Sequence, residues 1–126
     1  MPPSPLIQRG SFQRDLGQLD LRLRAARALV LEINQAAWTV VTAGQTPDAG
    51  LQAELRAVAT FATDVAVDVV TSAYRYLGGS AVYKPNILER AVRDIYTATQ
   101  HFMVSSTAYE THGETLLGVA RTDPLI

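Results

Sequence analysis

The sequence predicts an all-α protein, an up-down bundle of three long antiparallel helices that self-association completes. Apolar residues make up 48% of the 126-residue chain and charged residues 18%, a balance typical of a packed globular domain. Through most of the chain the apolar positions advance by alternating steps of three and four, the period of one helix face. Glycine and proline gather at the two places where this period is interrupted, and they divide it into three helices.

The boundaries follow from these interruptions. Gly44 and Pro47 end the first helix, and Asp48 supplies a carboxylate that can cap the N-terminus of the second. We predict a bundle domain over 11–118, with helices at 11–43, 49–77 and 86–117, between an irregular lead-in at 1–10 and a loose tail at 119–126.

The second predicted helix is apolar on most sides, as the run 61–70 shows. A helix with this pattern is normally buried all round, and three such helices have more apolar surface than they can hide from one another. We therefore expect a homo-oligomer, a dimer or a tetramer.

Charge and composition exclude several classes of partner. The net charge of −1 gives no electrostatic basis for binding nucleic acid or an anionic membrane. The chain has no cysteine, so disulfides, thiolate metal ligands and thiol catalysis are excluded. The N-terminus lacks the apolar core of a signal peptide, and no segment is expected to approach a membrane span. These features predict a cytoplasmic protein.

The most particular pattern joins a turn to a helix start. Gly78 and Gly79 can adopt backbone angles closed to other residues, so a long helix can end there. Pro85 suits the first turn of the next helix, and Asn86 with Glu89 three residues later has the spacing of a capping pair.

Charged residues and a histidine follow on that helix. The segment reads Arg90-x-x-Arg93-Asp94, and His101 comes seven residues after the aspartate. With the glycine pair and an Ala-Ala-Arg segment ending at Arg27, this pattern resembles the C-terminal helical domain of the acyl-CoA dehydrogenase superfamily, most closely its flavin-dependent monooxygenase branch. The resemblance runs from about residue 11 to 118, nearly the whole chain.

The resemblance implies a four-helix bundle that lacks its first helix here. In the family this bundle is the third domain, and an N-terminal helical domain and a β-sheet domain form much of the flavin site; neither is found in this sequence. It implies that Gly78 and Gly79 face the cofactor. Arg93 is a candidate for binding the cofactor phosphate, because the planar donors of arginine suit an anion. The resemblance also implies FAD or FMN where a separate flavin-binding subunit complements the chain, or no cofactor for the chain alone.

Three residues are candidates for acid–base chemistry. His101 exchanges a proton near neutral pH, and the resemblance places it near the flavin; the structural alternative is a histidine satisfied within the bundle. Asp64 and Asp68 lie one turn apart in an apolar helix, where like charges are unfavourable without cationic partners. Arg24 or Arg27 can supply these partners in salt bridges, and the catalytic alternative is a carboxylate pair that shares a proton.

Other polar and aromatic residues have both a structural and a functional interpretation. Arg90 and Asp94, at i and i+4, can form a surface ion pair, while an arginine there can also bind a cofactor phosphate or a neighbouring subunit. No metal site is expected, because His112 lacks a partner at helical ligand spacing. Four aromatic residues can line a pocket near the glycine turn or belong to the core: Trp38, Tyr74, Tyr76 and Tyr83.

Three functions follow. The first is the C-terminal helical and oligomerisation domain of an acyl-CoA dehydrogenase-like flavin-dependent monooxygenase or oxidoreductase, which contributes one wall of a flavin and substrate site. The second is a free-standing cofactor-free enzyme that isomerises or cyclises a small organic substrate. The third is a non-catalytic oligomeric scaffold.

Overall fold

The chain is all-helical in the computed structural model, which describes residues 5–77, 87–101 and 104–119. No strand occurs in these ranges, so the predicted all-α class is confirmed. The elements in chain order are the short 3₁₀ helix η1 at Leu6–Gln8, α1 at Gly10–Thr42, α2 at Ala49–Leu77, α4 at Ile87–Ala98 and α5 at Thr107–Leu117.

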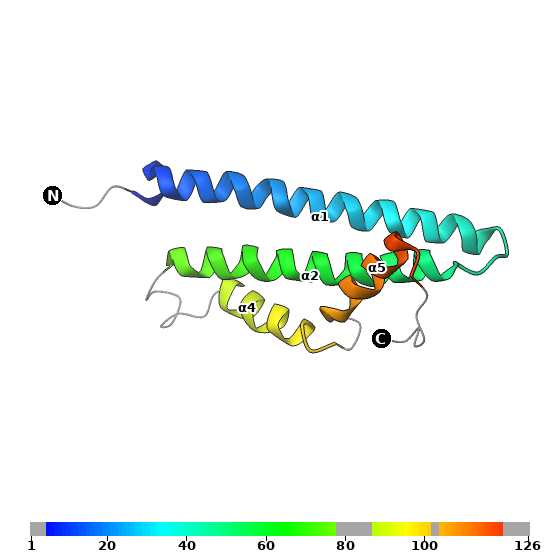
Figure 1. Ribbon diagram of the computed structural model, residues 1–126. Helices are drawn as coiled ribbons and strands as arrows, with labels where there is room; N and C mark the ends of the chain where they lie inside the picture. Colours follow the sequence, from blue (N-terminus) through cyan, green and yellow to red (C-terminus); the bar gives the residue numbers. More distant parts are fainter. Residues whose placement is uncertain (1–4, 78–86, 102–103, 120–126) are drawn as a thin grey trace.

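Two long antiparallel helices, α1 and α2, form the frame of the molecule (Figure 1). They lie where the sequence predicts helices at 11–43 and 49–77. Gly44 follows the end of α1 with a φ of 79°, a left-handed angle that a side chain would disfavour. Asp48 then caps α2, because its Oδ1 accepts a hydrogen bond from the Leu51 backbone N–H at 2.8 Å.

Helix α2 is central. It packs against α1 along one side and against α4 and α5 elsewhere (Figure 1). The buried apolar side chains line these contacts, and most of them are small, which lets the helix backbones approach closely. They are Ala26 and Ile33 of α1, Ala53, Ala57, Val58 and Val65 of α2, and Ala108 of α5.

The third predicted helix, 86–117, is not one helix; this prediction was wrong. The structure has α4 and α5 instead, and residues 99–101 and 104–106 between them are not helical. Near the end of α4 the hydroxyl groups of Thr97 and Thr99 donate to the carbonyls of Arg93 and Tyr96, and such bonds compete with the helical pattern. Ser105 then binds the N-terminus of α5, where its Oγ accepts from the Thr107 N–H at 3.3 Å.

The start of α5 is also attached to α2. Thr60 on α2 is 2% exposed, and its hydroxyl lies 3.4 Å from the Ser105 carbonyl oxygen and 3.3 Å from the Ser105 nitrogen. At the other end of α5, a Cβ added to Gly50 would come within 3.2 Å of the Thr115 methyl carbon. Glycine at the start of α2 thus permits this close packing.

The sequence analysis expected no segment to approach a membrane span. This expectation was wrong, because one helix has the length and the composition of such a span. Among the described residues one helix, Ala49–Tyr76, is long and apolar enough to cross a membrane, and 22% of its most apolar window is buried within the chain. One such helix is weak evidence. The helix carries five charged residues, and Asp64 and Asp68 near its middle contact α5 and α1, which is typical of a helix packed against protein.

Candidate functional site

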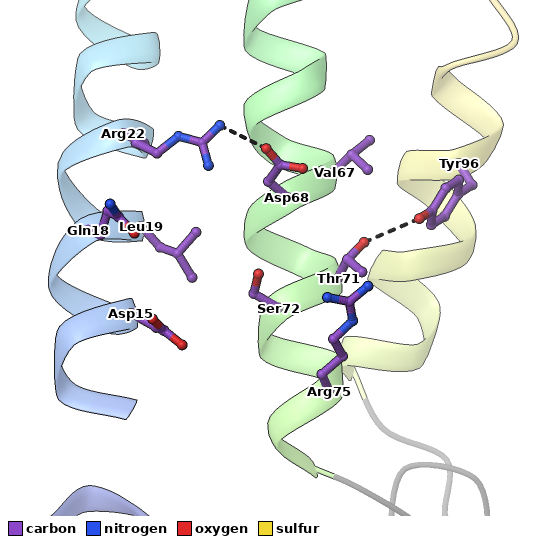
Figure 2. A pocket seen from close by; sticks show the side chains of 10 residues that line it. All are labelled: Asp15, Gln18, Leu19, Arg22, Val67, Asp68, Thr71, Ser72, Arg75 and Tyr96. Atoms are coloured by element: carbon purple, nitrogen blue, oxygen red, sulfur yellow. Dashed lines mark hydrogen bonds and ion pairs between the residues drawn. The ribbon is translucent and has the colours of Figure 1, made fainter. Parts of the chain in front are cut away.

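A polar groove opens between α1, the second half of α2 and α4 (Figure 2). Its volume is about 390 Å³. Four of its residues follow one face of α2, because positions 68, 71, 72 and 75 recur at helical spacing. The lining consists of Asp15, Gln18, Leu19, Arg22, Val67, Asp68, Thr71, Ser72, Arg75 and Tyr96.

Interactions across this polar groove join α2 to both of its neighbours. Arg22 of α1 forms an ion pair with Asp68 at 2.8 Å, and the Thr71 and Tyr96 hydroxyl groups lie 3.3 Å apart between α2 and α4 (Figure 2). Both interactions are exposed, so each adds little to stability, about 1 kcal/mol or less. Their effect is to fix the positions of the groups that line the groove.

Tyr76 lies between this polar groove and an apolar one on α1 and α2. Its hydroxyl donates a short hydrogen bond to Asp15, and this bond is the main cause that raises the pKa of the Tyr76 phenol. Its ring meets the Phe12 ring edge-on, with centroids 4.9 Å apart and planes at 79°. The apolar groove, also about 390 Å³, is lined by Leu6, Phe12, Leu16, Leu19, Asp20, Leu23, Val69, Ala73, Tyr76 and Leu88.

The two candidate carboxylates of α2 are engaged separately. Asp68 pairs with Arg22, and Asp64 accepts a hydrogen bond from the Tyr109 hydroxyl of α5 at 2.5 Å. Both aspartates are exposed, so the expected buried salt bridges with Arg24 or Arg27 were wrong. The reason is rotation about the axis of α1: Arg24 and Arg27 lie about 200° and 140° around the helix from Arg22. Arg24 instead lies 3.6 Å from Asp20 on its own helix.

His101 lies beyond the end of α4, in the segment between α4 and α5, and is exposed. Its backbone N–H donates to the Ala98 carbonyl at 3.1 Å, so its position follows directly from the end of that helix. Asp64 and Asp68 lie on α2, in a different element. The structure does not test the catalytic role predicted for these three residues, which stays a prediction.

The ion pair on α4 joins different residues from those expected. Arg93 lies 3.4 Å from Glu89, and within the described residues no ion pair joins Arg90 to Asp94. Both pairings have the i,i+4 spacing, which is why the sequence did not decide between them. Arg27 is exposed on α1.

Of the four predicted pocket aromatics, the three that the structure describes do not come together. Trp38 is 64% exposed near the end of α1 that is distant from Tyr76; the 26 residues from Phe12 to Trp38 span about 39 Å of helix. Tyr74 is half-buried on α2, and Tyr76 alone of this set lines a described groove. Tyr83, Gly78 and Gly79 lie outside the described residues.

A second cluster of titratable groups lies between α1, α2 and α5. It borders a cavity of about 270 Å³ lined by Leu29, Glu54, Ala57, Val58, Phe61, Tyr109 and His112. Burial and the hydrogen bond to Asp64 raise the pKa of the Tyr109 phenol well above its ordinary value of 10.0. The Nδ1 atom of His112 is buried without a hydrogen-bond partner. In the part of the chain that the structure describes, no group of three acidic, histidine or cysteine side chains is arranged to hold a metal ion.

Sequence reasoning missed Tyr109 and Arg75 as site residues. Arg75 follows Asp68 by seven residues, or two helical turns, so the sequence places the two side chains on one face of the helix. Tyr109 had no local signal, because its contact with Asp64 depends on the interruption between α4 and α5.

The fold and the sequence together indicate the protein family of this all-helical chain. The family model described as acyl-CoA dehydrogenase, C-terminal domain, matches residues 4–106, and the chain belongs to this family. It is also 32% identical over 113 residues to indole-3-acetate monooxygenase of Pseudomonas putida. This match covers 90% of the chain and 29% of that protein, so the chain spans less than a third of the length of this relative.

Proposed function

We propose that the chain acts as the C-terminal helical and oligomerisation domain of an acyl-CoA dehydrogenase-like flavin-dependent monooxygenase. The family match over 4–106 and the similarity to a monooxygenase support this proposal. In this role the bundle contributes one wall of a flavin and substrate site, and other protein supplies the remainder.

One observation carries the proposal: α1 exposes a row of large apolar side chains along its length. The members of this row, the α1 apolar face, are between 46% and 64% exposed: Leu16, Leu23, Leu31, Trp38 and Val41. A row of this kind along a long helix marks a protein interface. Its length suits another helix, and we propose that a second copy of the bundle covers it.

The described residues do not by themselves fit a flavin. The polar and apolar grooves are open, and Arg93, with 76% of its side chain exposed, lies on α4 outside both. A phosphate could be bound by Arg93 only together with groups from elsewhere. No step of a flavin reaction is therefore assigned to these residues, and the cofactor, FAD or FMN, belongs to the assembly.

The relative's name indicates that it acts on indole-3-acetate, a small aromatic acid. We propose the same broad class, a small organic acid, for the assembly to which this chain contributes. The polar groove supports this choice, because it presents guanidinium and hydroxyl donors.

The test is flavin retention. The purified chain is incubated with excess FAD or FMN, alone and with a separately produced protein that carries the part of the relative that this chain does not match, and each mixture is passed through gel filtration. We expect visible flavin absorption to coelute with this chain when that second protein is present. If the chain never elutes with flavin under either condition, the flavoenzyme proposal fails.

A second candidate, a cofactor-free acid–base catalyst, is favoured by one observation. Tyr109 and His112 border the same cavity, and Asp64 accepts the Tyr109 proton in a hydrogen bond. This arrangement supplies titratable groups beside a hollow without any cofactor. A chain that never retains flavin but turns over a small substrate, with loss of that activity in Tyr109→Phe, would favour this candidate.

A further inference from the structure

The charges of the polar groove are unevenly matched. Asp68 is paired with Arg22 at 2.8 Å, and Asp15 is engaged by the Tyr76 hydroxyl and by Arg14 at 3.6 Å. Both carboxylates of the groove therefore have partners. Within the described residues Arg75 has no ion-pair partner.

Among the described residues, one cation of the groove is therefore left without a carboxylate partner. Two arginines, Arg22 and Arg75, line the groove with two carboxylates. Because Asp15 is also paired with Arg14 from outside the lining and Asp68 with Arg22, the unmatched cation is Arg75. A guanidinium group has a planar fork of donors that matches the two oxygens of a carboxylate. Its position in a groove, beside low-dielectric helix walls, strengthens this attraction relative to an open surface.

Hydroxyl groups stand next to Arg75. Ser72 and Thr71 lie three and four residues before it on the same face of α2, and both line the groove with the Tyr96 hydroxyl (Figure 2). The Thr71 and Tyr96 hydroxyl groups lie 3.3 Å apart, which orients them toward each other across α2 and α4. Hydroxyl donors beside a guanidinium supply the additional hydrogen bonds that a bound carboxylate accepts.

We propose that the polar groove binds the carboxylate of a small organic acid, with the Arg75 guanidinium as its anion-binding group and the Ser72 and Thr71 hydroxyl groups as additional donors. The volume of about 390 Å³ suits a molecule of the size of phenylacetate. The role of this acid as a substrate rests on the proposed monooxygenase function. The binding itself does not require a flavin.

The test is an NMR titration of the 126-residue chain with phenylacetate, and phenylacetamide serves as the uncharged ligand of the same shape. We expect saturable shifts of the Arg75 Nε–Hε signal and of backbone amides at 67–75. Phenylacetamide should bind at least about 10-fold more weakly, because charge-assisted hydrogen bonds are lost.

Variants separate this site from general charge effects. Arg75→Gln should weaken phenylacetate binding by about 10- to 100-fold. Arg75→Lys should restore part of it, since an ammonium keeps the charge without the planar fork. Arg27→Gln is the matched control, because Arg27 is also exposed but lies outside the groove, and it should leave the affinity unchanged.

Several outcomes would overturn the inference. They are the absence of saturable shifts, equal binding of acid and amide, an unchanged affinity in Arg75→Gln, or tighter binding of inorganic phosphate than of phenylacetate, which would assign the groove to a phosphate group. Far-UV circular dichroism establishes that the exposed-site variants are folded. Acid binding without flavin retention would reject the monooxygenase role and keep the acid site, so the two proposals fail separately.

Discussion

The two halves of α2 differ in what covers them. From Ala53 to Val65 the helix has buried positions that face α1 and α5, and these are mainly alanine, valine and threonine. From residue 66 to 76 no residue is buried, and Asp68, Thr71, Ser72 and Arg75 line an open groove. The first half is therefore built for close packing, and the second half presents polar groups. One helix thus has a packed half and a half that lines an open polar groove.

Removing a large buried side chain should have the largest effect. Ile33 of α1 is 5% exposed, and Ile33→Ala should lower the free energy of unfolding by about 2 to 4 kcal/mol, because the cavity it leaves cannot fully collapse. Urea unfolding followed by circular dichroism measures this change. Leu31→Ala is the control, since Leu31 is 62% exposed and should change the stability of the single bundle by less than about 0.5 kcal/mol. Equal losses of stability in Ile33→Ala and Leu31→Ala would contradict the distinction between buried and exposed positions.

The attachment of α5 to the packed half should have a smaller effect. Thr60→Val removes the hydroxyl that lies 3.3 Å from the Ser105 nitrogen and 3.4 Å from its carbonyl oxygen, and should cost about 1 to 2 kcal/mol. Amide hydrogen exchange should then speed up in α5 more than in α1. Thr63→Val is the matched control, because the Thr63 hydroxyl donates to Ala59 of its own helix at 2.8 Å. An α5 as protected in Thr60→Val as in Thr63→Val would show that this attachment is unimportant.

The smallest expected effect depends on pH. The pKa of Tyr109 is raised in the folded chain above the ordinary value of 10.0, so the folded state holds this proton more tightly than the unfolded state. The resulting stability is fully present below pH 10 and is lost as the pH rises toward the folded pKa. Tyr109→Phe should therefore lose less stability above pH 10 than the wild type does.

Urea unfolding at a series of alkaline pH values measures this difference. Tyr76→Phe provides a comparison at the other end of α2, since the pKa of Tyr76 is also raised, mainly by its hydrogen bond to Asp15. If the free energy of unfolding changes with pH to the same extent in the wild type and in Tyr109→Phe, the contact with Asp64 does not depend on the phenol proton.

The fold could be predicted as far as periodicity determines it. Alternating steps of three and four from Phe12 to Val40 and from Leu51 to Tyr76 specify helices, and α1 and α2 occupy these positions. The interruption after Ala98 was not predicted, because the same apolar period continues through it. At this interruption Ser105 contacts Thr60 of α2, and this contact depends on tertiary structure.

The candidate site could be predicted only in outline. The sequence shows that Asp64 and Asp68 need partners, since like charges stand one turn apart in an apolar helix. Which partner each finds depends on the rotation of α1 and on the position of α5, and neither is encoded locally. Arg22 and Tyr109 therefore emerged only from the structure.

The central claim is that the single bundle is incomplete and that a second copy covers the α1 apolar face. Sedimentation velocity over a range of concentrations tests it most directly, with Leu23→Glu placed in that face and Leu21→Glu about 200° around the same helix as the control. We predict that the wild type and Leu21→Glu associate, and that Leu23→Glu sediments as the 13.7 kDa monomer. A wild type that stays monomeric at every concentration, or association that Leu23→Glu leaves unchanged, would contradict this account.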